Sequence, residues 1–170
     1  WFFLPLVLLG YGIAPGLKAK NTVLLVFSLL FYARGEPKYI ILMILSICLN
    51  YVFGLGIQKA GENRGKRTIL LWACVGINLC LLGYFKYFNF FLQIGNRLLG
   101  GEVLAYRDIA LPIGISFYTF QAMSYVIDVW KGENKAQKNL WDLALYISFF
   151  PQLIAGPIVK YHDIEKQLVE

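Results

Sequence analysis

Residues 39–58 read YIILMILSICLNYVFGLGIQ and contain no charged side chain. A helix rises about 1.5 Å per residue, so a run of this length matches the ~30 Å hydrocarbon core of a lipid bilayer. Three further runs, residues 68–85, 109–127 and 143–159, also lack charged side chains. The runs are continuous and do not alternate with a period of two, which argues against a transmembrane β-barrel. The pattern therefore predicts an all-α fold, a polytopic bundle of transmembrane helices.

The composition excludes several other classes of protein. Hydrophobic residues make up 58% of the 170 residues and charged residues only 15%, whereas soluble domains carry about 25% charged residues. These values exclude a disordered chain, a secreted disulfide scaffold and a soluble α/β enzyme. Cys48, Cys74 and Cys80 lie in apolar runs without C-x-x-C spacing, so we expect neither disulfides nor a metal site.

The apolar runs divide residues 1–170 into one membrane domain. We predict spans at about residues 1–14, 21–33, 39–57, 69–92, 111–130 and 140–159. The chain starts at Trp1 without a methionine, inside an apolar run, and stops at Glu170. We therefore expect the N-terminal part of a longer protein.

Loop charges predict how the spans are oriented. The loops at residues 58–67 and 131–139 are both net positive, and Lys18 and Lys20 fall on the same side of the map. Cytoplasmic loops carry an excess of lysine and arginine, so this side is predicted to be cytoplasmic, with residues 93–110 outside. The net charge of +6 then reflects topology and anionic lipid headgroups, and nucleic acid is not an expected partner.

A polar stripe follows one helix in residues 111–130, which read LPIGISFYTFQAMSYVIDVW. Its members are spaced four, three, four and three residues apart: Gly114, Tyr118, Gln121, Tyr125 and Asp128. This spacing places them on one helix face, which should turn toward the bundle interior or a wet cavity, while Ile115 faces lipid. Two interpretations remain open. One is hydrogen bonding between helices, with Asp128 pairing with Lys131 or another cation, and the other is the lining of a substrate path.

A weaker stripe of small and polar residues lies in an earlier span. It consists of Ser46, Asn50 and Gly54, and Asn78 is a single polar residue in the next span. We interpret all four as packing residues.

The last apolar run is predicted to break within the membrane. Asn139 can cap a helix that has Asp142 in its first turn, and only about 16 Å of helix fits before Pro151, too little to span. Broken backbone at membrane depth must be buried in protein or line a cavity. We therefore add four residues of the broken segment to the predicted lining, Pro151, Gln152, Gly156 and Pro157. The alternative is a proline kink in an ordinary span.

His162 is the only histidine of the chain. It stands in a polar stretch without an arranged serine nucleophile, and a single histidine does not make a metal site. We assign it a surface or packing role. G-x-S-x-G, P-loop and GxGxxG patterns are absent.

Two stretches, LPIGISFYTFQAMSYVIDVWKGE (residues 111–133) and FFPQLIAGPIVKYHDIEKQL (residues 149–168), closely resemble the membrane-bound O-acyltransferase family. The similar branch is the bacterial alginate O-acetyltransferase type, and residues 1–7 and 31–39 resemble its N-terminal pattern. The resemblance implies transfer of an acyl group, acetyl in this branch, to hydroxyls of an exported polysaccharide such as alginate. It also implies a multi-pass protein of the bacterial cytoplasmic membrane, no bound cofactor, an acyl donor such as acetyl-CoA or an acyl carrier, and a periplasmic esterase-like acetyltransferase as partner.

The family uses a catalytic histidine in an apolar, membrane-embedded setting, and no position of this chain matches that motif. We therefore expect the catalytic residue beyond Glu170, no catalytic role for His162, and no activity of this fragment alone. The contribution of the fragment would be part of the ring of helices around a funnel.

A second function remains open from the residues. Broken helices and polar stripes also occur in carriers, so a transporter or flippase subunit for a polar lipid or glycan precursor is the alternative. Within the acyltransferase interpretation, the acceptor is left open between alginate, cellulose, peptidoglycan and another glycan.

Overall fold

The structure is a computed structural model that describes residues 2–99 and 111–149. Within these ranges the secondary structure consists of helices: α1 (Phe3–Ile13), α2 (Gly16–Gly35), α3 (Ile40–Lys59), α4 (Arg64–Leu99), α5 (Ile115–Lys131) and α6 (Leu140–Ser148). Three of them, α2, α3 and α4, are long and apolar enough to cross a membrane. The described part confirms the predicted class, an all-α membrane protein. The broken segment predicted near Pro151 lies outside the described residues.

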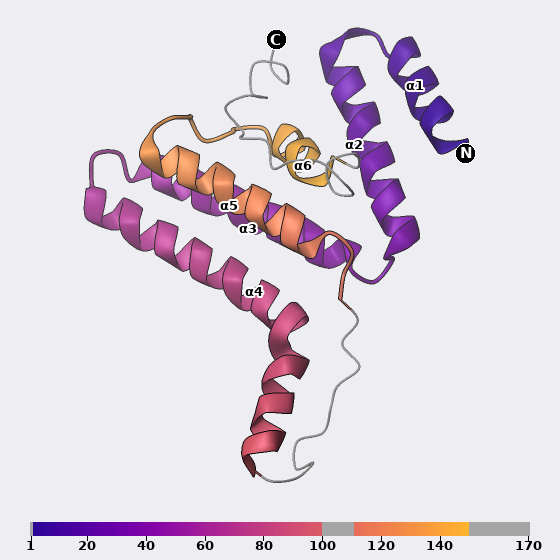
Figure 1. Ribbon diagram of the computed structural model, residues 1–170. Helices are drawn as coiled ribbons and strands as arrows, with labels where there is room; N and C mark the ends of the chain where they lie inside the picture. Colours follow the sequence, from indigo (N-terminus) through magenta and orange to yellow (C-terminus); the bar gives the residue numbers. More distant parts are fainter. Residues whose placement is uncertain (1, 100–110, 150–170) are drawn as a thin grey trace.

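The helices form a bundle with a hairpin beside it (Figure 1). Helices α3 and α5 lie side by side and run in the same direction, and the first part of α4 packs against both in the opposite direction. The second part of α4 bends away from the bundle, while α1 and α2 form an antiparallel hairpin on the other side. The short helix α6 packs against α2, α3 and α5.

Helix α5 is the centre of the described core. Its buried residues include Tyr118, Ala122, Tyr125 and Val126, all at most 1% exposed. Helix α4 turns one face toward α3 and α5, formed by residues spaced three or four apart: Leu71, Cys74, Asn78 and Leu82. An α-helix brings residues at this spacing onto one face, so a single stripe of α4 is covered and the rest is left for lipid.

Two helices are longer than the apolar runs that predicted them. Helix α2 begins at Gly16 and therefore includes Lys18 and Lys20, and α4 extends from Arg64 to Leu99, where a span of residues 69–92 was expected. A lysine or arginine can remain part of a membrane helix, because its long side chain can direct the charge to water at the membrane surface. The membrane boundaries of these spans stay predictions, because a helix can extend beyond the hydrocarbon.

The two positively charged loops meet at one end of the bundle, as their charges predict. The Arg67 guanidinium at the start of α4 donates to the carbonyls of Val129 (3.1 Å) and Trp130 at the end of α5. The side-chain oxygen of Gln58 accepts the N–H of Ala136 at 3.0 Å. The shared end is confirmed, and its cytoplasmic position stays a prediction. We call it the basic end.

A polar cluster joins α3 to α4 inside the apolar core. The side-chain amides of Asn50 and Asn78 hydrogen bond to each other in both directions, at 3.2 and 3.1 Å. The Asn50 amide also donates to the Ser46 carbonyl (2.8 Å), and the Cys74 thiol donates to Asn50 Oδ1 (3.3 Å). The interpretation of Ser46, Asn50 and Asn78 as packing residues is confirmed. Because the two amides bond to each other, both can be buried in an apolar core without losing their hydrogen bonds.

Replacing one asparagine of this pair is expected to destabilise the protein more than replacing both. Asn50→Leu leaves the Asn78 amide buried without its main partner, which costs about 1–3 kcal/mol of unfolding free energy. The double variant Asn50→Leu/Asn78→Leu removes both groups and should recover most of that loss. The check is a double-mutant cycle on the unfolding of the full-length protein in detergent. Strictly additive losses would contradict the reciprocal pairing.

Candidate functional site

The polar residues predicted to share one helix face do so along α5. Tyr118, Gln121, Tyr125 and Asp128 have exposed fractions of 1%, 2%, 0% and 3%. They face the bundle, as expected for polar side chains in a membrane domain. We call these four residues the polar stripe.

Two details of the predicted stripe were wrong. Gly114 precedes α5 as its N-cap, with φ of 76°, a left-handed conformation that favours glycine, so it does not extend the helix face. Ile115, expected to face lipid, is 3% exposed. Helix α5 is packed by α3, α4 and α6, so it buries more of its circumference than one stripe.

Two members of the polar stripe hold other segments in place. Gln121 Nε2 donates to the carbonyl oxygen of Tyr146 in α6 at 2.6 Å. The Tyr125 hydroxyl accepts the N–H of Gln137 at 3.0 Å and lies against Gly54 of α3, where an added Cβ would stand 2.7 Å from the hydroxyl oxygen. Hydrogen bonding between elements is thus established for Gln121 and Tyr125. Their part in a substrate path stays a prediction.

The stripe ends near the C-terminus of α5, where several backbone carbonyls accept hydrogen bonds. The backbone carbonyl of Asp128 accepts the N–H of Glu133 at 3.1 Å, and Gly132 follows the helix with φ of 82°, an arrangement typical of helix C-termini. The Lys131 ammonium, an expected partner of Asp128, lies 3.6 Å from the Glu133 carboxylate. Arg67 supplies a cation to this end through its bonds to the last carbonyls of α5, where a positive charge is favourable.

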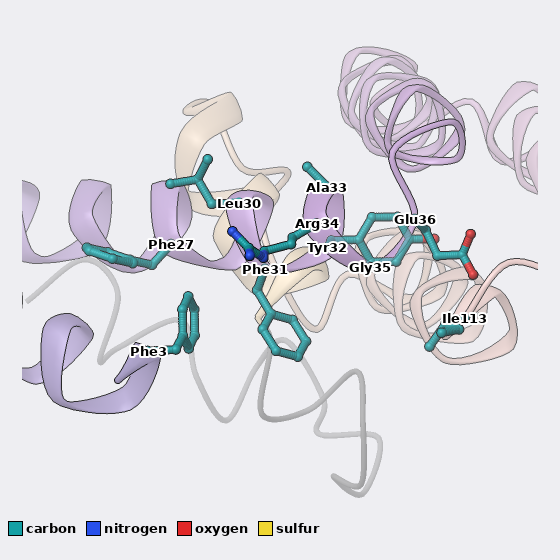
Figure 2. A pocket seen from close by; sticks show the side chains of 10 residues that line it. All are labelled: Phe3, Phe27, Leu30, Phe31, Tyr32, Ala33, Arg34, Gly35, Glu36 and Ile113. Carbon is teal, nitrogen blue, oxygen red and sulfur yellow. The ribbon is translucent and has the colours of Figure 1, made fainter. Parts of the chain in front are cut away.

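At its other end the stripe reaches a cavity. The Tyr118 ring contacts the Tyr32 ring of α2 edge to face, with centroids 6.3 Å apart. Tyr32 lines a cavity of about 890 Å³ that we call the aromatic cavity. Its lining residues are Phe3, Phe27, Leu30, Phe31, Tyr32, Ala33, Arg34, Gly35, Glu36 and Ile113 (Figure 2).

The walls of the aromatic cavity come from three parts of the chain. Phe3 of α1 packs against Phe27 and Phe31 of α2, with ring centroids 5.8 and 5.3 Å apart. Figure 2 shows these three rings on one side and Ile113, from the segment before α5, on the other. The cavity therefore lies at the end of the bundle opposite the basic end. It is apolar apart from Arg34 and Glu36.

The aromatic cavity was not among the features predicted from the sequence. Residues 31–39, which include six of its lining residues, were noted only for their resemblance to the family. The four-residue spacing of Phe27 and Phe31 was a usable signal for an aromatic helix face. That Phe3 and Ile113 complete the walls follows only from the tertiary structure.

Five predicted site residues lie outside the described residues: Pro151, Gln152, Gly156, Pro157 and His162. The segment that leads to them is described as far as Phe149. Asn139 caps α6 through the N–H of Trp141 (3.1 Å) and bonds to Asp142 (2.9 Å), which confirms the predicted helix start. Ser148, at the end of α6, is fully buried. Among residues 2–99 and 111–149, no three His, Cys, Asp or Glu side chains are grouped to hold a metal ion.

Comparisons with known proteins give a consistent set of relatives. The chain is 40% identical over 172 aligned residues to the probable alginate O-acetylase of Pseudomonas aeruginosa, covering 98% of this chain and 32% of that protein. It is 39% identical to the probable alginate O-acetylase of Azotobacter vinelandii, covering 98% of the chain and 34% of the relative. The peptidoglycan O-acetyltransferase of Helicobacter pylori is 36% identical, with 97% of the chain and 36% of the relative covered.

The chain thus spans about a third of the length of the curated relatives it matches. The similarity confirms the resemblance to the alginate O-acetyltransferase branch. No family model matches the chain, and no solved structure matches it.

Proposed function

We propose that this chain is part of a membrane-bound O-acyltransferase that moves an acetyl group onto hydroxyls of an exported polysaccharide. The observation that carries the proposal is the similarity of nearly the whole chain, at 36–40% identity, to proteins named as O-acetylases or O-acetyltransferases of polysaccharides. The comparisons give no support to the alternative, a transporter or flippase subunit.

Acyl transfer to a hydroxyl needs a group that takes the hydroxyl proton while the oxygen attacks the acyl carbonyl. Imidazole suits this role because it titrates near neutral pH. The single histidine of the chain, His162, stands between Tyr161 and Asp163 in a charged stretch of the sequence, whereas the catalytic histidine of the family lies in an apolar one. The catalytic base is therefore placed beyond this chain, in the remaining part of the full-length protein.

The described helices would supply the wall around that centre. The polar stripe of α5 faces inward, and Gln121 ties the buried end of α6 to α5. Helix α6 leads directly into the segment with Pro151 and Pro157, which we place near the reacting groups. An acyl donor such as acetyl-CoA would approach from the basic end. The polysaccharide would approach from the end with the aromatic cavity, on the outer side of a bacterial cytoplasmic membrane, where an esterase-like acetyltransferase would be the partner.

The proposal is tested by the O-acetyl content of the exported polysaccharide. Deletion of the gene should remove the O-acetyl groups, and the full-length protein supplied from a plasmid should restore them, as measured by NMR of the purified polymer. Unchanged O-acetylation in the deletion strain would refute the proposed function.

The same assay tests the role of His162. We expect His162→Ala in the full-length protein to retain acetylation within about tenfold of wild type, because His162 is not the proposed base. Loss of the general base itself typically costs ~10²–10⁴-fold in rate. Protein abundance is followed by immunoblot. A thousandfold loss at normal abundance would place the base in this chain after all.

A further inference from the structure

The basic end holds a cleft of about 510 Å³ with charged walls. It lies between the turn that joins α3 to α4, the first turn of α4 and the end of α5. The lining residues are Glu62, Arg64, Arg67, Trp130, Lys131 and Glu133. We call it the basic cleft.

The charges of the cleft are not balanced. Three cations face two carboxylates, and the Lys131–Glu133 pair, 3.6 Å apart, is half exposed, so the ammonium can exchange this carboxylate for a phosphate. Arg64 and Arg67 then stand against Glu62 alone. Lys59 and Lys66, next to the cleft in sequence, add further positive charge at this end, so the cleft favours an anion.

One of the two guanidinium groups is held in position. Arg67 Nη2 donates to the carbonyls of Val129 and Trp130, which fixes the side chain against α5. Its bonds to α5 are made by Nη2 alone, and its buried Nε has no hydrogen-bond partner among the described residues of the chain. A guanidinium fixed in this way loses little conformational entropy when it binds a ligand.

The side chains indicate the class of ligand. Arginine presents planar pairs of N–H donors that match phosphate oxygens, and lysine adds a mobile point charge. Trp130 also lines the cleft, and an aromatic side chain there suits the organic part of a phosphate ester. The volume exceeds what a bare inorganic anion needs.

We propose that the basic cleft binds a phosphate ester at the membrane surface, with Arg64, Arg67 and Lys131 as the phosphate ligands and Trp130 against the esterified group. Two sources carry this chemistry: the headgroup of an anionic lipid and a soluble phosphate ester. The site does not depend on the proposed acyl transfer, because its test measures binding.

The test compares two variants of the full-length protein in nanodiscs. Arg64→Gln/Lys131→Gln removes two cations from the cleft, whereas Lys135→Gln/Lys138→Gln removes two cations from the loop beyond α5, outside the cleft lining. Arg67 is kept because it also holds the end of α5. Circular dichroism and thermal unfolding establish that both variants are folded, and the charge-preserving variant Arg64→Lys/Lys131→Arg serves as a second check.

Two probes distinguish the sources. Adenosine 3′,5′-bisphosphate, followed by isothermal titration calorimetry, represents a soluble ester, and phosphatidylglycerol retained from mixed nanodiscs, followed by native mass spectrometry, represents a lipid headgroup. We expect Arg64→Gln/Lys131→Gln to weaken binding of at least one probe about tenfold or more, since charge-assisted hydrogen bonds are the strong ones, with binding kept by the charge-preserving variant. A loss confined to one probe supports the site and identifies its source. Equal binding of both probes by wild type and Arg64→Gln/Lys131→Gln, or an equal loss in the Lys135→Gln/Lys138→Gln control, overturns the proposal.

Discussion

Gly54→Ala is expected to lower the unfolding free energy of the full-length protein by about 2 kcal/mol, and Gly54→Leu to leave little folded protein. A Cβ at this position would stand 2.7 Å from the hydroxyl oxygen and 2.9 Å from Cε1 of Tyr125. Tyr125 is fully buried and accepts a hydrogen bond from Gln137, so the ring cannot move without giving up that bond. The loss outweighs the gain of up to about 1 kcal/mol that alanine brings over glycine inside a helix.

The measurement is heat-induced loss of the monodisperse peak in detergent chromatography. Gly76→Ala is the matched control, because nothing lies within 4 Å of a Cβ built at Gly76, and it should be neutral or mildly stabilising. Gly54→Ala/Tyr125→Phe should recover part of the loss, since the hydroxyl is the atom nearest to the new methyl group. Equal stability of Gly54→Ala and Gly76→Ala would contradict the contact between α3 and α5.

Gln121→Leu is expected to reduce polysaccharide O-acetylation by ten- to a hundredfold while most of the protein remains in the membrane. The amide of Gln121 donates to the Tyr146 carbonyl at 2.6 Å, one of the carbonyls at the end of α6 that have no partner within the helix. Without it, the end of α6 and the segment that follows can shift, and displacements of about 1 Å near a reaction centre can cost 10²-fold in rate.

Phe117→Leu is the control for this prediction, because Phe117 also lies in α5 but is 40% exposed. It should retain activity close to wild type. Abundance by immunoblot separates catalytic loss from degradation. Wild-type acetylation in Gln121→Leu would show that the link between α5 and α6 has no part in the reaction.

Local features of the sequence predicted most of the helices. Runs without charges predicted α3 and the apolar part of α4. Pro15 lies between the predicted spans 1–14 and 21–33, and α1 ends before it, because proline disfavours helix in the residue before it. The capping pattern of Asn139 and Asp142 predicted the start of α6. These signals act within a few residues along the chain, so they are readable without knowing what packs against them.

The spacing of the polar stripe also carried information about orientation. Four polar side chains on one face of a membrane helix must turn toward protein, and α5 places them there. The same reasoning misplaced Ile115, because a helical wheel shows which residues share a face but not how many faces are covered.

The order of residues was thus enough to predict a bundle of membrane helices, the inward face of α5 and the common end of the two positive loops. The pairing of the buried polar groups depends instead on how the helices pack: Asn50 bonds to Asn78, Gln121 to the Tyr146 carbonyl, and Arg67 to the end of α5. The physical reason is that helix formation is governed by neighbours in sequence, whereas a buried hydrogen bond depends on the distance between groups that lie 25 to 63 residues apart. For the same reason, the aromatic cavity and the basic cleft exist only through the packing of segments that are distant in sequence, among them α1, α2, α4 and α5.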